Sequence, residues 1–77
     1  MTDSTFNGWA NWQTWSVSLW IQNDEPLYRM ARQFRHHGYK ALIPMLQEYM
    51  GFANPDGCDW DDPALDVEEL DEMLSEL

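Results

Sequence analysis

The acidic residues of this sequence are concentrated enough to suggest a chemistry. That chemistry is the binding of a basic surface. Residues 56–77 hold ten of the 14 acidic residues and contain no Lys or Arg. Seven of these carboxylates fall within 62–76. On a helix that rises about 1.5 Å per residue they would give roughly one charge per 3 Å, comparable with the ~3.4 Å per charge along one DNA strand. The pattern predicts a nucleic-acid-like surface that occupies a basic groove.

The residues predicted to bind the partner are acidic, with two aromatic side chains that would add a desolvated contact. They are Asp59, Asp61, Asp62, Asp66, Glu68, Glu69, Glu72, Glu76, Trp9 and Trp12. The two aromatic residues belong to a cluster of four tryptophans in residues 9–20, more than one side of a short helix can bury, so at least one is expected at the surface. Base stacking by this cluster is disfavoured because no Lys or Arg precedes Arg29 to hold a phosphate backbone, and core packing is the better interpretation for most of it.

Two simpler interpretations of the acidic segment stay open. Acidic tails are common, and such a segment can serve only to keep a protein soluble. Adaptation to high salt would explain the acidity without any target. The absence of interspersed Lys or Arg, which normally relieves self-repulsion on a solvated face, favours a binding role.

The overall charge narrows the classes of partner. Four Lys plus Arg against 14 Asp plus Glu give a formal net charge of −10. Repulsion disfavours direct binding to nucleic acid or to anionic membranes, so the expected partner is a basic protein. The longest apolar stretch is far short of the ~20 residues of a membrane span, and the start MTDSTFNGW carries no visible export signal. A cytoplasmic protein is expected.

No grouping of residues indicates catalysis, a cofactor or a metal site. His36 and His37 are adjacent and would project about 100° apart on a helix, so they cannot chelate one ion as an i, i+4 pair can. Cys58 and its neighbouring aspartates lack the spacing and the final Glu of a calcium loop, and one cysteine allows no internal disulfide. The serines have no elbow glycines and no base nearby. We expect a protein that is not an enzyme.

The length and the apolar periodicity predict the elements that position these residues. A chain of 77 residues allows one small domain. The spacing of its apolar residues predicts an all-α fold of about four short helices, the last of them acidic. We expect a mobile N-terminal arm over residues 1–10 and a single helical domain over 11–77.

The first two helices carry clear start signals. A helix over 12–22 is predicted with Asn11 as its N-cap. Its core face is predicted to consist of the apolar residues at helical spacing, Trp12, Trp15, Leu19 and Trp20, widened by Val17 and Ile21. A second helix is expected to begin with Asp24 and Pro26 and to stop at Gly38.

The later helices are interrupted by prolines. Pro44 predicts a turn around 39–42 and regular helix only over 43–50. A loop follows, with Trp60 as its expected anchor in the core.

The last helix is predicted to start with Asp62 as cap and Pro63 at its first position. Its apolar stripe would consist of Pro63, Val67, Leu70, Leu74 and Leu77, opposite a broad acidic face.

Residues 11–28, NWQTWSVSLWIQNDEPLY, resemble a pattern found in small uncharacterised proteins of phages and mobile elements. The pattern is Asn, an aromatic residue, Thr-Trp, Val, Leu-Trp and Asn followed by an acid, and it is matched by Asn11, Trp12, Thr14, Trp15, Val17, Leu19, Trp20, Asn23 and Asp24. The motif is structural and transfers no activity. The resemblance implies a genomic setting in which small acidic proteins often block host defences.

Charge pattern and resemblance together predict a non-enzymatic acidic inhibitor. It would be a phage-encoded anti-CRISPR or anti-restriction protein, acting in the host cytoplasm on the basic surface by which a CRISPR effector or a restriction enzyme takes DNA. The alternative is a small structural or adaptor protein of a virus or mobile element, whose acidic tail only confers solubility.

Overall fold

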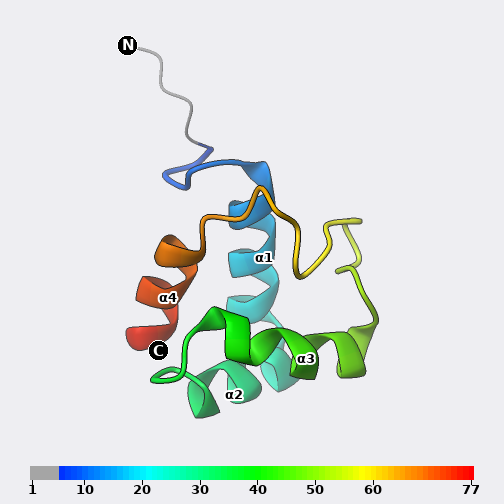
Figure 1. The fold of residues 1–77 in the computed structure, drawn as a ribbon, viewed down its shortest axis with the longest axis vertical. Coiled ribbons are helices and arrows are strands. Elements are labelled where there is room, and N and C mark those ends of the chain that lie inside the picture. Colours follow the sequence, from blue (N-terminus) through cyan, green and yellow to red (C-terminus); the bar gives the residue numbers. More distant parts are fainter. Residues whose placement is uncertain (1–5) are drawn as a thin grey trace.

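The computed structural model describes residues 6–77, and this part of the chain folds as four helices with no β-strand. They are α1 (Trp12–Asn23), α2 (Glu25–Gln33), α3 (Tyr39–Met50) and α4 (Val67–Ser75). Figure 1 shows α1 at the centre, α2 and α3 across its lower end, and α4 beside it. α1 packs against α2 and α4, and α3 packs against the same two helices. The predicted all-α class is confirmed. Within residues 6–77, none of the helices is both long and apolar enough to cross a membrane.

α1 begins where the sequence predicts, but the face it buries agrees only in part with the predicted one. Asn11 is its N-cap and accepts the Thr14 backbone N–H at 2.9 Å. The buried residues of the helix are Thr14, Ser16, Val17, Ser18 and Ile21. Trp12 and Leu19 are each 38% exposed, so their predicted place in the core is wrong, whereas Val17 and Ile21 are fully buried as predicted. Small and β-branched side chains let α1 approach its neighbours closely, whereas indoles on the same face would hold the helices apart.

α2 starts as predicted and ends early. Asp24 is its N-cap and accepts the Leu27 N–H at 3.2 Å. The helix ends at Gln33 instead of reaching Gly38. Phe34 packs against the core and the chain turns after it, which a continued straight helix would not allow.

α3 runs through Pro44 without a break, so the turn predicted at its start is wrong. Pro44 and Lys40, whose carbonyl loses a helical donor, are both on the exposed side, where water can replace the bond. The start of the helix is held by tertiary contacts. The Asp71 carboxylate accepts the Tyr39 N–H at 2.6 Å. The buried Tyr39 side chain donates its hydroxyl to the Trp60 carbonyl.

α4 begins later than predicted, with Asp66 instead of Asp62 as its N-cap. The Asp66 side chain accepts the Glu69 N–H at 3.1 Å, whereas Asp62 accepts the Ala64 N–H at 2.7 Å and closes a separate turn. The hydroxyl of Thr14 on α1 accepts the Asp66 N–H at 3.0 Å. This contact determines where α4 starts, because it brings Asp66 against α1.

The loop between α3 and α4 is attached to α1 by polar contacts. The Asn54 amide donates to the Ser16 hydroxyl at 3.0 Å and accepts the Cys58 N–H at 3.1 Å. The Asp56 carboxylate accepts the indole N–H of Trp20 at 2.9 Å. These bonds explain why a serine is buried in α1 and why one edge of Trp20 stays at the surface.

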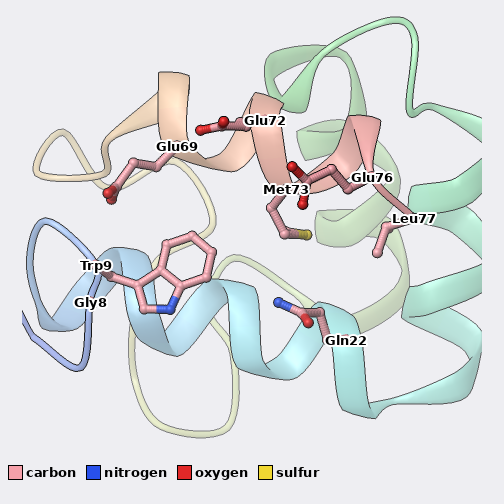
Figure 2. A pocket seen from close by; sticks show the side chains of 8 residues that line it. All are labelled: Gly8, Trp9, Gln22, Glu69, Glu72, Met73, Glu76 and Leu77. Carbon is pink, nitrogen blue, oxygen red and sulfur yellow. The ribbon is translucent and has the colours of Figure 1, made fainter.

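The described part of the predicted N-terminal arm forms a tight turn. Asn7 and Gly8 have φ angles of 51° and 89°, and the flanking Phe6 and Trp9 exchange backbone hydrogen bonds of 2.6 and 2.8 Å. This geometry is typical of a type I′ turn. It places the Trp9 indole beside α4 (Figure 2). Residues 1–5 of the arm lie outside the described residues, and the mobility of the arm stays a prediction.

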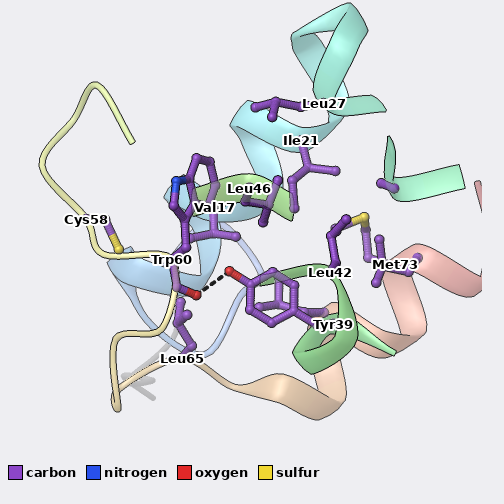
Figure 3. Close-up of a cluster of buried hydrophobic side chains, with 13 residues drawn as sticks. Val17, Ile21, Leu27, Tyr39, Leu42, Leu46, Cys58, Trp60, Leu65 and Met73 are labelled. Atoms are coloured by element: carbon purple, nitrogen blue, oxygen red, sulfur yellow. Dashed lines mark hydrogen bonds between the residues drawn. The ribbon is translucent and has the colours of Figure 1, made fainter. Parts of the chain in front are cut away.

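The hydrophobic core contains residues from all four helices and the loop (Figure 3). It consists of Val17, Ile21, Leu27, Ala31, Tyr39, Leu42, Leu46, Cys58, Trp60, Leu65, Leu70, Met73 and Leu74. Trp60 is its largest fully buried side chain, so its predicted role as the loop's anchor is confirmed. Pro63, which was predicted on the apolar stripe of the last helix, is exposed, and Met73 is buried instead.

Candidate partner-binding site

Some of the carboxylates that the sequence assigns to partner binding hold the fold together. Asp66 caps α4 and Asp62 closes the turn before it. Glu69 accepts the Ala10 N–H at 2.8 Å and so ties the N-terminal turn to α4. Asp71 was not assigned to the site, and it holds the start of α3. These groups still contribute negative charge, but their positions are set by internal hydrogen bonds.

A second group of carboxylates is exposed, and their side chains make no hydrogen bond within residues 6–77. They are Asp59, Asp61, Glu68, Glu72 and Glu76. The last three recur every fourth residue, so they form one outward stripe along α4, which we call the acidic stripe. Its charges are about 6 Å apart along the helix axis, roughly half the density of one DNA strand.

The acidic stripe has no neutralising partner in the described part of the chain. The one ion pair of residues 6–77 joins Arg29 and Glu25 on α2 at 2.8 Å, and both side chains are 73% exposed. Because α4 buries its opposite face in the core, the stripe is presented on a rigid element. The acidic segment is therefore a core-forming helix and not an appended tail.

A groove of about 510 Å³ lies between α1 and α4 beside the stripe (Figure 2). We call it the α1–α4 groove. Its α4 side carries the carboxylates of Glu69, Glu72 and Glu76, and Figure 2 shows the Trp9 indole and Met73 between the two helices. The structure thus brings Trp9 together with three of the predicted acidic residues.

Trp12, the other aromatic residue assigned to the site, does not line this groove and is exposed elsewhere on α1. Gln22 and Met73 line the groove but were not assigned to it. A signal for Met73 was present, because it follows Leu70 at helical spacing, whereas no local pattern marks Gln22. The turn signature Asn7-Gly8 could also have placed Trp9.

Among residues 6–77, no three His, Cys, Asp or Glu side chains are grouped so that they could hold a metal ion. His36 and His37 lie in the turn after α2, because the helix ends before them and does not reach Gly38 as predicted. Burial raises the pKa of the Cys58 thiol to about 11, and the nearby Asp62, Asp59 and Asp56 add to this. The thiol is therefore protonated at neutral pH and is a poor nucleophile.

The raised pKa of Cys58 predicts a loss of stability in alkali. In the unfolded chain the thiol ionises near its usual pKa of 9.0, whereas the folded protein keeps the proton up to about 11. The contribution of the protonated Cys58 thiol to the free energy of unfolding is complete below pH 9 and is lost as the pH rises through 11. We expect the melting temperature to fall more steeply over this range in the parent than in Cys58→Ala. Burial also raises the pKa of Tyr39, but this residue is present in both proteins and affects them equally. Equal slopes of melting temperature against pH in the two proteins would therefore contradict the raised pKa of Cys58.

The fold and the site define a small all-α protein with an acidic face that no cation of residues 6–77 neutralises and an adjoining groove. The chain belongs to DUF7249, a family of unknown function, whose family model matches residues 2–77. No curated protein and no solved structure matches the chain. Because the match extends to the end of α4, the acidic helix lies within the family's domain.

Proposed function

We propose that this protein is a non-enzymatic inhibitor that occupies a basic, nucleic-acid-binding surface of another protein. One observation carries the proposal: α4 buries one face in the core and presents on the other a row of carboxylates that no cation of residues 6–77 neutralises. A fold does not need such a row, because mixed charges would keep the helix equally soluble with less repulsion.

The acidic stripe would act by competition with nucleic acid. A net charge of −10 attracts a basic surface over several ångströms and speeds the encounter. Asp59 and Asp61, exposed on the loop before α4, add negative charge outside the helix. Once bound, the carboxylates would lie where phosphates otherwise bind. The exposed Trp12 would add an apolar contact.

The resemblance to proteins of phages and mobile elements supports a defence effector of the host as the target. A CRISPR effector or a restriction enzyme fits the chemistry, because each must expose a basic surface to take DNA. The protein would then act in the cytoplasm of the host cell.

A role as a structural or adaptor protein is the second candidate, and exposed apolar side chains favour it. Phe52 is 76% exposed and Tyr49 is 51% exposed near the end of α3. An adaptor could bind through such side chains and use the acidic stripe only for solubility.

Competition with DNA tests the proposed function. The tagged protein would be used to capture partners from a host extract, and each captured protein would be identified and purified. We expect a basic nuclease that duplex DNA displaces, and a complex that weakens as salt rises because exposed charges are screened beyond about 10 Å near 0.1 M. Capture of a virion component that neither DNA nor salt displaces would favour the adaptor.

A further inference from the structure

We infer that the α1–α4 groove receives an arginine side chain of the basic partner. The inference rests on the proposed function and adds the residue type that the partner supplies. It starts from the difference between the groove and the acidic stripe: Glu72 and Glu76 belong to both, but only the groove also offers an aromatic surface, the half-buried Trp9.

The groove combines apolar side chains, Trp9, Met73 and Leu77, with the amide of Gln22 and a negative rim. Trp9 and Met73 pack against the hydrophobic core, while the rim carboxylates of Glu72 and Glu76 are exposed. An anion would be repelled by this rim. A purely apolar group would displace water from the carboxylates without giving them a hydrogen bond or a positive charge in return. A side chain with an apolar stem and a cationic head suits both parts.

Arginine fits this combination better than lysine. A guanidinium is planar, so it can stack on an indole and still donate paired hydrogen bonds to carboxylates. An ammonium is more strongly hydrated and has no plane with which to stack. The contact with Trp9 therefore favours arginine, whereas the carboxylates alone would attract either residue.

The cations of the described chain do not line the groove. Arg35 donates to the Leu77 carbonyl at 3.1 Å and so fixes the end of α4, and Arg29 pairs with Glu25. Arg32 lies over the Tyr28 ring on α2. A second copy of this chain is a poor occupant, because two molecules of net charge −10 repel each other.

Glu69 acts as a positioning residue in this arrangement. One of its oxygens accepts the Ala10 N–H at 2.8 Å, directly after Trp9 in the chain. This bond holds the type I′ turn against α4 and thereby sets the position of the indole.

The test uses the full-length protein and a neutral pentapeptide with one central arginine, acetyl-Gly-Gly-Arg-Gly-Gly-amide. Peptides with lysine or with uncharged citrulline at the centre are the comparison. Binding is followed by the NMR signals of the tryptophan indole N–H groups, with the Trp9 signal assigned from Trp9→Phe. We expect the arginine peptide to shift the Trp9 signal most, the lysine peptide to bind about tenfold more weakly, and the citrulline peptide to cause no shift.

Two single substitutions that remove one charge from the same helix form the matched pair. Glu72→Gln changes the groove and Glu68→Gln changes only the acidic stripe, and both residues are exposed, so neither change should unfold the protein. We expect Glu72→Gln to weaken the arginine peptide several-fold and Glu68→Gln to have much less effect. Equal effects of the two substitutions, equal binding of arginine and lysine, or no shift of Trp9 would overturn the inference.

The two proposals can fail separately. If the peptide does not bind but DNA still displaces the captured nuclease, the groove inference is wrong and the proposed function stands. If the peptide binds as expected but no captured partner responds to DNA, the arginine site is supported and the inhibitor function is wrong. Self-association that depends on protein concentration and perturbs Trp9 would show that a second copy fills the groove, and this too would overturn the inference.

Discussion

Replacing Trp60 with alanine is expected to remove most of the free energy of unfolding of this protein. Trp60 is completely buried, and truncating a buried tryptophan costs about 3–5 kcal/mol. Domains are stable by only about 5–15 kcal/mol, and small ones lie near the lower end. Its backbone also links two elements, because the backbone N–H of Trp60 donates to the Phe52 carbonyl at 2.9 Å and the Trp60 carbonyl accepts the Tyr39 hydroxyl. Loss of the side chain would loosen the loop and the start of α3 together.

Urea unfolding followed by circular dichroism measures this effect, with Trp12→Ala as the control. Trp12 is 38% exposed, so its truncation should cost no more than about 1 kcal/mol. The apolar periodicity of α1 instead predicts large losses at Trp15 and Trp20, which the structure shows to be only half-buried. Equal destabilisation by Trp12→Ala and Trp60→Ala would show that the assigned core is wrong.

Reversing the charge of the acidic stripe is expected to abolish binding to the basic partner while the protein stays folded. The triple variant Glu68→Lys, Glu72→Lys, Glu76→Lys moves the formal net charge from −10 to −4, since each substitution changes the charge by two units. All three side chains are exposed and free of hydrogen bonds within residues 6–77. Lysine in the last turn also suits the helix dipole, which offsets the cost of lysine in the first turn.

The choice of positions depends on the structure. On sequence alone, Asp66, Glu69 and Glu72 are equally good candidates for reversal, because all three lie outside the apolar stripe. Two of them are unsuitable, since Asp66 caps α4 and Glu69 holds the N-terminal turn. Reversal there would lower stability and binding together.

Melting temperature and affinity for the captured partner should be measured on the same samples. Glu48→Lys, at an exposed carboxylate on α3, is the control for a general charge effect and should reduce affinity far less than Glu72→Lys. A triple variant that folds, binds and inhibits like the parent would refute the nucleic-acid-mimic mechanism. The exposed aromatic surface around Trp12 would then be the next candidate.

The sequence by itself determined the features that depend on neighbouring residues. Asn11 and Asp24 are N-caps because a short polar side chain before a helix can reach the backbone N–H groups of its first turn. Gly51 ends α3 with a φ of 91°, a conformation that residues with a Cβ rarely adopt. The helical class and the acidic character of the C-terminal segment follow from local spacing and composition, so they were also predictable.

Tertiary contacts decided the helix boundaries that local signals left ambiguous. Asp62-Pro63 and Asp66 are both acceptable starts for the last helix, and the bond from the Asp66 N–H to the Thr14 hydroxyl selects the second. Pro44 disfavours helix before it, but the anchoring of Tyr39 outweighs that local preference. Such contacts join residues far apart in the chain, and no local pattern contains them.

The tertiary structure also decided which carboxylates are available to a partner. Asp66 and Glu68 have the same charge and lie two residues apart, yet one caps α4 and the other projects from it. Trp9 lies at the candidate site because of another long-range hydrogen bond. The Glu69 carboxylate accepts the Ala10 N–H and holds the turn against α4. Charge is a property of each residue and can be read from the sequence. Whether a charge is used inside the fold or left on its surface depends on which backbone N–H groups the packed helices bring within reach.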